Sequence, residues 1–202
     1  MRMIALGESE TLGRSKRETK ANTGQEAELK KIKALFRDKD VLVSQPEDIE
    51  GLSSRGYGVA ENEKLTLTLC ETLFLLTKGI IEVRDKKTRE DVGFQDILNR
   101  FESLDENAWV KYLIYRDLRS RGYVAREGFG LGIDFRIYER GEYGKETAKY
   151  LVFGIQEGQP VSVETLAQAL KNVHGLKKNL VIAVISRRGE VVYYSLSQMA
   201  PK

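Results

Sequence analysis

Residues 162–196 read SVETLAQALKNVHGLKKNLVIAVISRRGEVVYYSL. Ser162 can cap a helix over Val163 to about Val173, because its hydroxyl accepts a hydrogen bond from a backbone N–H of the first turn. Leu180–Ile185 and Val191–Leu196 are rich in β-branched and aromatic residues, and the glycine-containing turn between them predicts a hairpin. This stretch therefore predicts a helix followed by two paired strands.

The residues before this stretch extend the same pattern. A helix is predicted between a capping Asp105 and a closing Gly122, because apolar side chains recur at helical spacing between them. Three β-rich runs follow, at 123–125, Ile133–Tyr138 and Lys149–Ile155. The order helix, three strands, helix, two strands predicts a β-sheet with helices packed on it.

The first half of the chain mixes helices and strands on a smaller scale. A helix is predicted from the spacing of Leu29, Ile32, Leu35 and Phe36. The apolar stretch Leu65–Leu76 predicts one buried helix, closed by a glycine that follows it. The other predicted elements are strands at Val41–Val43 and Ile80–Val83 and a helix over 92–101.

We predict the fold class to be α/β (α+β), with two domains preceded by a tail. Residues 1–26 contain few large apolar side chains, so they cannot bury enough area to offset the entropy of ordering, and a disordered tail is predicted. A small mixed N-terminal domain is predicted over 27–103. A C-terminal domain, with a mixed sheet flanked by helices, is predicted over 104–202.

The composition of the 202 residues excludes several classes of protein. A single cysteine, Cys70, excludes a disulfide framework within the chain, and a single histidine, His174, excludes a multi-histidine metal site. No apolar run approaches the roughly 20 residues that span a bilayer, so we expect no membrane segment and a cytoplasmic protein. The net charge of +3 permits a nucleic-acid partner without requiring one.

Tyr138 stands between two arginines at the end of a predicted strand. Strand alternation places Phe135 and Ile137 on one face, and Arg136 and Tyr138 on the other. A tyrosine among cations is either a surface pair or a proton-transfer group with a lowered pKa, and the residues alone favour the surface pair. The spacing around His174 likewise favours a half-buried structural histidine over a catalytic one.

Five separated blocks of the chain resemble the archaeal tRNA-splicing endonucleases. They are YLIYRDLRSRGY (112–123), GIDFRIYERG (132–141), KYLV (149–152), NLVIAV (179–184) and VVYY (191–194). The resemblance implies a nuclease-like C-terminal domain and a four-domain complex that recognises a bulge-helix-bulge in precursor tRNA. It also implies cleavage without metal or other cofactor, in which the ribose 2′-hydroxyl attacks the adjacent phosphate and leaves 2′,3′-cyclic phosphate and 5′-hydroxyl ends.

The resemblance implies three catalytic side chains, of which this chain retains two. The general base corresponds to Tyr138 and the charge-stabilising lysine to Lys178. The general acid is a histidine in the family, but Thr147 stands at its position, and a threonine hydroxyl is too weak an acid to protonate a leaving alkoxide. Two further departures are Lys171, where the family often has arginine, and Gly130, where it often has lysine. The cationic residues expected to contact RNA are Lys171, Arg136, Arg140 and Lys177.

These observations lead to three hypotheses about the chain. The favoured one is a structural subunit of the endonuclease, whose partner chain carries a complete tyrosine, histidine and lysine set. In the second, the chain is itself catalytic, with Tyr138, Lys178 and a replaced general acid. The third is an RNA-binding module that does not cleave. We expect precursor tRNA and catalytic or identical subunits as partners, and we predict that the apolar edge strand Val191–Tyr194 is buried in a subunit interface.

Overall fold

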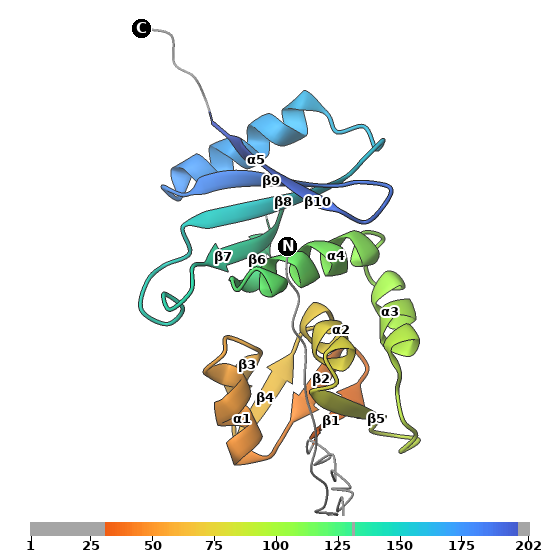
Figure 1. Cartoon of the computed structure of the whole chain (residues 1–202). Helices are drawn as coiled ribbons and strands as arrows, with labels where there is room; N and C mark the ends of the chain where they lie inside the picture. Colours follow the sequence, from red (N-terminus) through yellow and green to blue (C-terminus); the bar gives the residue numbers. More distant parts are fainter. Residues whose placement is uncertain (1–30, 131, 198–202) are drawn as a thin grey trace, which may run out of the picture. The chain divides into compact units, whose positions relative to one another are not determined.

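The computed structural model describes residues 31–130 and 132–197. The tail predicted over residues 1–26 lies outside the described residues. The first described part carries the strands β1 (Ile32–Arg37), β2 (Asp40–Val43), β3 (Val59–Glu61), β4 (Lys64–Leu67) and β5 (Ile81–Asp85). Its helices are α1 (Pro46–Ser53), α2 (Leu69–Thr77) and α3 (Phe94–Glu102). Within this described part the sheet has the order β3-β4-β2-β1-β5, and only the β1–β5 pair is parallel (Figure 1).

The helix predicted around Ile32 is wrong, because Ile32–Arg37 forms the strand β1. β1 lies between β2 and β5, so its backbone groups bond to two neighbouring strands rather than along a helix. Ala34 is buried at the centre of the strand. Pairing on both sides therefore outweighs the accidental helical spacing of its apolar residues.

The single helix predicted over Leu65–Leu76 is also wrong, because a strand and a helix share this stretch. β4 ends at Leu67, and Thr68 is the N-cap residue of α2. The Thr68 hydroxyl accepts from the Glu71 N–H (3.3 Å), and the Glu71 carboxylate accepts from the Thr68 N–H (2.9 Å). This reciprocal capping box fixes where the chain changes from strand to helix.

The second sheet follows the predicted order of elements. Its strands are β6 (Val124–Gly130), β7 (Ile133–Tyr138), β8 (Tyr150–Gln156), β9 (Asn179–Ile185) and β10 (Val191–Leu196). The helix α4 (Ala108–Ser120) precedes β6, and the helix α5 (Val163–Gly175) lies between β8 and β9. Among the described residues its strand order is β10-β9-β8-β7-β6. The β8–β9 pair is parallel and is connected through α5, whereas the other pairs are antiparallel. α4 packs on one face of this sheet and α5 on the other (Figure 1).

Of the two predicted helix caps, one is confirmed and one is wrong. The Ser162 cap of α5 is confirmed, because its hydroxyl accepts from the Thr165 N–H at 3.0 Å. The Asp105 cap is wrong, because Asn107 is the N-cap residue of α4. Asp105 instead accepts from the Asn107 N–H (2.9 Å) and pairs with Lys111 on the first turn. Its carboxylate therefore supports the start of α4 from outside the helix.

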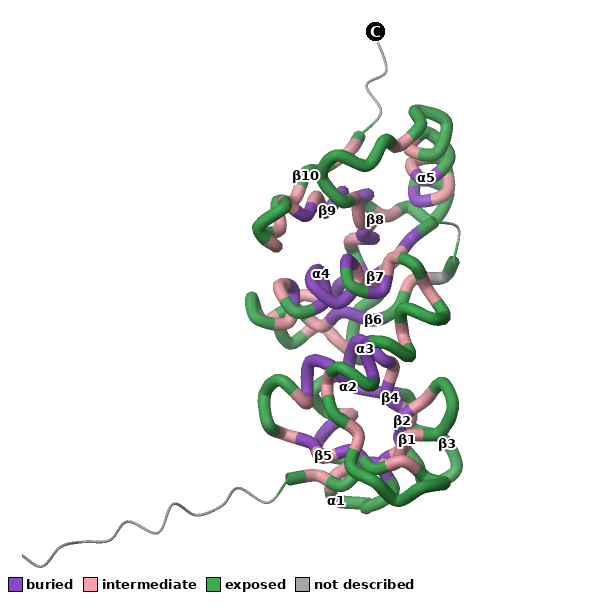
Figure 2. Tube along the Cα trace, turned by 90° about the vertical axis from the view of Figure 1, so that its right-hand side faces the viewer, coloured by how far each residue is buried: buried purple, intermediate pink, exposed green. Residues whose placement is uncertain are grey.

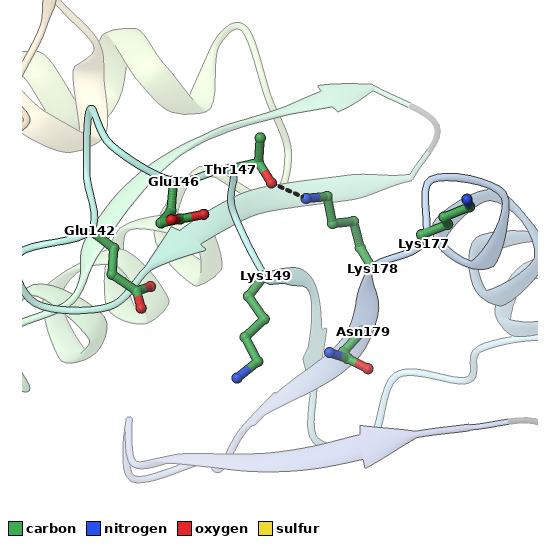
Figure 3. A pocket seen from close by; sticks show the side chains of 7 residues that line it. All are labelled: Glu142, Glu146, Thr147, Lys149, Lys177, Lys178 and Asn179. Atoms are coloured by element: carbon green, nitrogen blue, oxygen red, sulfur yellow. Dashed lines mark hydrogen bonds between the residues drawn. The ribbon is translucent and has the colours of Figure 1, made fainter.

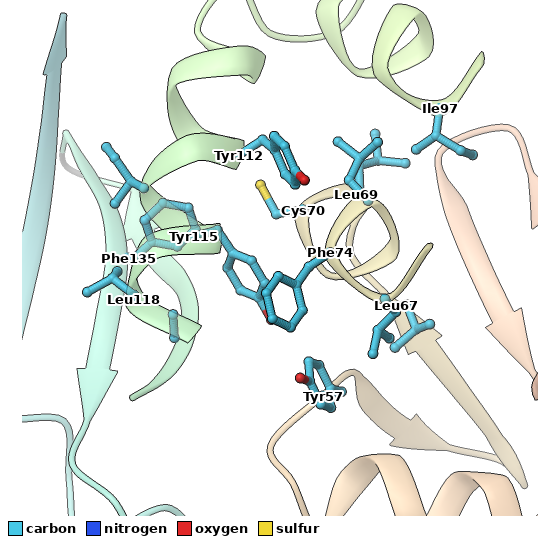
Figure 4. Packing of buried hydrophobic residues seen from close by; sticks show 14 of the residues in the cluster. Tyr57, Leu67, Leu69, Cys70, Phe74, Ile97, Tyr112, Tyr115, Leu118 and Phe135 are labelled. Carbon is cyan, nitrogen blue, oxygen red and sulfur yellow. The ribbon is translucent and has the colours of Figure 1, made fainter. Parts of the chain in front are cut away.

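One buried cluster joins the two sheets through α2 and α4 (Figure 2). Tyr115 of α4 packs its ring against Phe74 of α2 and Phe135 of β7, with both pairs of ring centroids 5.9 Å apart (Figure 4). Burial raises the pKa of the Tyr115 phenol. Its hydroxyl is the one buried side-chain polar atom without a hydrogen-bond partner in the described residues. The ring, rather than the hydroxyl, therefore stabilises this junction.

A buried ion pair lies beside this cluster. Arg126 of β6 donates from Nη1 to Glu71 Oε1 at 2.8 Å, and both side chains are nearly inaccessible (9% and 2% exposed). Glu71 Oε1 also accepts from the Gly58 N–H at 3.1 Å. Burial raises the pKa of the Glu71 carboxyl, and Arg126 with the two backbone donors opposes that rise. The pair therefore connects the second sheet to the capping box of α2.

The first prediction concerns this pair. Arg126→Leu leaves the Glu71 carboxylate buried without its cation, and we expect the free energy of unfolding to fall by about 3–5 kcal/mol. Urea denaturation measures the change. Arg84→Leu is the matched control, because the Arg84–Asp91 pair is exposed (55% and 82%) and its loss should cost less than about 1 kcal/mol. Equal losses in the two variants would contradict the importance assigned to the buried pair.

Candidate functional site

A pocket of about 290 Å³ lies at the end of the second sheet where β8 and β9 begin. Because these strands are parallel, Tyr150 pairs with Asn179, and the loop before β8 lies beside the turn that follows α5. The residues that line the pocket are Glu142, Glu146, Thr147, Lys149, Lys177, Lys178 and Asn179 (Figure 3). We call it the lysine pocket.

Thr147 and Lys178 face each other in the lysine pocket. Lys178 Nζ donates to Thr147 Oγ1 at 2.6 Å across 31 residues of chain (Figure 3). The main chain holds both segments, because the Asn179 N–H donates to the Lys149 carbonyl (3.1 Å) and the Lys178 N–H donates to the Val173 carbonyl (3.2 Å). The structure therefore brings together two residues that the sequence analysis assigned to one site.

Lys177 points in a different direction from its neighbour. Its backbone adopts a left-handed conformation (φ 54°), which few non-glycine residues adopt. The ammonium groups of Lys177 and Lys178 consequently diverge, and Lys177 points away from Thr147 (Figure 3). Lys178 is therefore placed at the centre of the pocket and Lys177 at its margin.

The pocket carries charges of both signs. Lys149, Lys177 and Lys178 bring three cations, while Glu142 and Glu146 bring two carboxylates from one turn. That turn is closed by a hydrogen bond from the Glu146 N–H to the Glu142 carbonyl at 2.9 Å. Residue spacing along the chain does not indicate Lys149 or either glutamate, because only the parallel register of β8 and β9 brings them to Lys178. The net positive charge of the pocket suits an anion such as a phosphate group.

Tyr138 does not line this pocket. It is half-buried at the end of β7, and its ring packs edge-to-face against Tyr143 with 5.2 Å between centroids. Within the described residues no hydrogen bond joins Tyr138 to Thr147 or Lys178. The predicted alternation of β7 is confirmed, since Phe135 and Ile137 are buried and Arg136 and Tyr138 are partly exposed.

The other predicted cationic residues lie outside the lysine pocket, Lys177 excepted. Arg136 donates from Nε to the Glu127 carbonyl at 2.9 Å. Arg140 lies against Gly122, where a Cβ would stand 2.9 Å from its Nη2. Lys171 and His174 are both exposed on α5, so the expectation of a half-buried His174 is wrong. α5 buries Ala169 and Val173 instead, which turns His174 to the surface.

At the contact between Thr147 and Lys178, this arrangement places an ammonium donor beside a hydroxyl group. Lys178 can donate to Thr147 and to an anion at the same time, because an ammonium group has three N–H donors. A threonine hydroxyl donates and accepts hydrogen bonds but does not release its proton near neutral pH. The geometry of Thr147 and Lys178 therefore supports binding of an anion more directly than acid–base chemistry.

No helix in 31–130 or 132–197 is long and apolar enough to cross a lipid bilayer. In these ranges there is also no group of three or more histidine, cysteine or acidic side chains that could hold a metal ion.

Comparison with known proteins matches both halves of the chain. The family model "tRNA intron endonuclease, N-terminal domain" matches residues 32–98, and "tRNA intron endonuclease, catalytic C-terminal domain" matches residues 108–193. A tRNA-splicing endonuclease of Methanococcus vannielii is 32% identical over 170 residues, which cover 84% of this chain and 96% of that protein. One from Pyrococcus furiosus is 36% identical over 143 residues, covering 71% of this chain and 81% of that protein.

Proposed function

The chain belongs to the tRNA intron endonuclease family, and we propose from this premise that it is a structural subunit of a tRNA-splicing endonuclease. In this proposal it binds precursor tRNA at a bulge-helix-bulge. A partner chain then supplies the complete catalytic set that generates 2′,3′-cyclic phosphate and 5′-hydroxyl ends. The domains proposed for these roles are an N-terminal one over 27–103 and a C-terminal one over 104–202.

The observation that carries the proposal is the contact between Thr147 and Lys178. Thr147 stands at the position of the family's general acid, and its Oγ1 lies 2.6 Å from Lys178 Nζ. The position therefore faces the phosphate-binding lysine, but it holds a hydroxyl in place of an imidazole. Losing a general acid costs about 10²–10⁴ in rate. The pocket is suited to hold a phosphate and poorly suited to cleave beside it.

Further cations would extend the RNA contact beyond the lysine pocket. Lys171, Lys177 and Arg140 are exposed, and Arg136 is partly exposed. Phosphate contacts of this kind position RNA without reading its sequence. We assign these residues to RNA binding, with Lys178 holding the phosphate nearest to Thr147.

A second candidate function is cleavage by this chain itself. It is favoured by Tyr138 and Lys178, which keep the residue types of the family's general base and charge-stabilising group. The carboxyl groups of Glu142 and Glu146 line the same pocket as Thr147 and are candidates for the replaced acid. The structural subunit remains the better supported candidate, because Tyr138 lies outside the pocket that holds Lys178.

Assembly is proposed through β10. This strand pairs with β9 on one side and is the edge of its sheet in the described residues. Val192 and Tyr194 are 48% and 55% exposed, although both are large and apolar or aromatic. An uncovered β-prone edge is a template for pairing with another chain. We therefore assign Val191–Tyr194 to the interface with a catalytic or identical subunit.

The second prediction tests the general acid. Thr147→His places an imidazole beside Lys178, and we expect cleavage of a bulge-helix-bulge RNA by the purified chain to rise by about 10²–10⁴. Gel analysis of a labelled RNA measures the rate. Lys178→Ala in the Thr147→His background should remove the gain. If the histidine leaves the rate unchanged, the residue at position 147 does not limit the rate of cleavage by this chain.

The third prediction concerns which subunit performs the cleavage. The chain mixed with a relative that carries histidine at the position of Thr147 should cleave, and Tyr138→Phe in this chain should leave that rate unchanged. The measurement is single-turnover cleavage by the purified mixture. Robust cleavage by this chain alone, or a large loss on Tyr138→Phe in the mixture, would favour the catalytic candidate.

The fourth prediction concerns the edge strand. Tyr194→Lys places a charge on β10, and we expect it to reduce the molar mass of the assembly in light scattering to that of smaller units. Val163→Lys is the control, because Val163 is 81% exposed and belongs to a different element, at the start of α5. An assembly that survives Tyr194→Lys intact would place the interface elsewhere.

A further inference from the structure

A second pocket, of about 240 Å³, lies at the end of α4 against the same sheet. Its apolar side chains come from the helix and two strands, namely Leu118, Ile137 and Val181. Three tyrosines also line it, namely Tyr123, Tyr150 and Tyr193, and two charged side chains, Arg121 and Glu139, complete the lining. We call it the tyrosine pocket. Apolar surface lined by aromatic rings suits a flat, partly polar ring system.

Hydrogen bonding fixes the ring of Tyr193 in this pocket. Its hydroxyl donates to Asp117 Oδ2 at 2.8 Å. Asp117 also accepts from Arg121 Nε at 2.6 Å, and the Arg121 guanidinium lies 5.4 Å from the Tyr193 ring centroid. One face of the pocket is therefore ordered before any ligand arrives, which lowers the entropic cost of binding.

The tyrosine pocket is adjacent to the lysine pocket. Lys149 lines the lysine pocket, whereas Glu139 and Tyr150 line the tyrosine pocket. Lys149 Nζ lies 4.0 Å from Glu139 Oε1 and 5.4 Å from the Tyr150 ring centroid. The Lys149 and Glu139 side chains are 58% and 43% exposed, so this ion pair is weak and easily rearranged. The two pockets therefore meet at Lys149, and a ligand that carries a phosphate and an attached ring is the kind that would occupy both.

We propose that the tyrosine pocket binds the nucleobase of an RNA residue whose phosphate lies in the lysine pocket. This inference rests on the proposed function, which places a phosphate at Lys178. Bases stack on aromatic side chains with affinities that depend little on sequence. Glu139 adds a polar preference, because its carboxylate accepts only and suits a base that presents N–H donors on its edge. Guanine, with a ring N–H beside an amino group, fits this wall better than uracil.

An aromatic side chain of a partner protein would also stack on the tyrosine rings of this pocket. The adjacent lysines favour RNA, because a nucleotide carries its anion at a fixed short distance from its base, whereas an isolated aromatic side chain carries none. A protein occupant is therefore treated as an outcome of the test.

The fifth prediction tests base binding with mononucleotides. In NMR titrations of the full chain, we expect guanosine 3′-monophosphate to bind about tenfold more tightly than inorganic phosphate, since one base gains one stacking contact. Uridine 3′-monophosphate should lie between them. Tyr123→Ala should remove the advantage of the guanosine nucleotide and leave phosphate binding unchanged. Tyr123 is suited to this test because its side chain is 36% exposed at the rim.

Two controls separate a lost ring from a disturbed fold. Tyr123→Phe keeps the ring and should retain the advantage of the nucleotide. Trp109→Ala removes another exposed aromatic ring, near the start of α4, and should change the affinity for neither phosphate nor the nucleotide. Lys178→Ala should weaken phosphate and nucleotide binding together.

The outcomes distinguish this inference from the function on which it rests. If phosphate binds but the base adds nothing, or if Tyr123→Ala leaves the advantage of the nucleotide intact, the base-binding inference is overturned and the proposed function stands. A pocket without base binding would then be assigned to a side chain of a partner protein. If Lys178→Ala changes the affinity of neither ligand, both the inference and the phosphate site at Lys178 are overturned.

Discussion

The carboxylate of Glu71 accepts hydrogen bonds from three separate parts of the chain. Thr68 closes the capping box of α2, Gly58 brings in the segment before β3, and Arg126 reaches across from β6. Each donor offsets part of the cost of burying the charge, and removing any one of them leaves the carboxylate incompletely paired. The start of α2, the first sheet and the second sheet are thus joined at one buried group, beside which Tyr115 packs its ring.

The parallel pairing of β8 and β9 then determines where the lysine pocket forms. Parallel strands need a crossover, and α5 provides it, so the ends of two distant segments meet at one edge of the sheet. Thr147 and Lys178 meet there although they are 31 residues apart. On the α4 face, the helix ends at Ser120, and the sheet beyond it is lined by tyrosines. Both pockets are consequences of this connectivity.

Local signals in the sequence predicted more of the second sheet than of the first. The Ser162 cap, the final hairpin and the alternation of β7 depend on neighbouring residues, and the structure bears them out. β1 was mistaken for a helix because its identity depends on two strands that pair with it from elsewhere in the chain. Within the lysine pocket, family resemblance indicated Thr147 and Lys178. Lys149, Glu142 and the tyrosine pocket depend on strand register, which residue spacing along the chain does not reveal.

In the proposed function, Thr147 stands in place of a general acid, which removes one property of the site and preserves another. A hydroxyl accepts from Lys178 without adding charge, so the ammonium stays in place with two N–H donors still available to an anion. A carboxylate at this position would form an ion pair with Lys178 and repel a phosphate, and an apolar side chain would leave Lys178 without its partner. Threonine is therefore compatible with the proposed role, in which this site binds a phosphate and a partner chain performs the proton transfer and the cleavage.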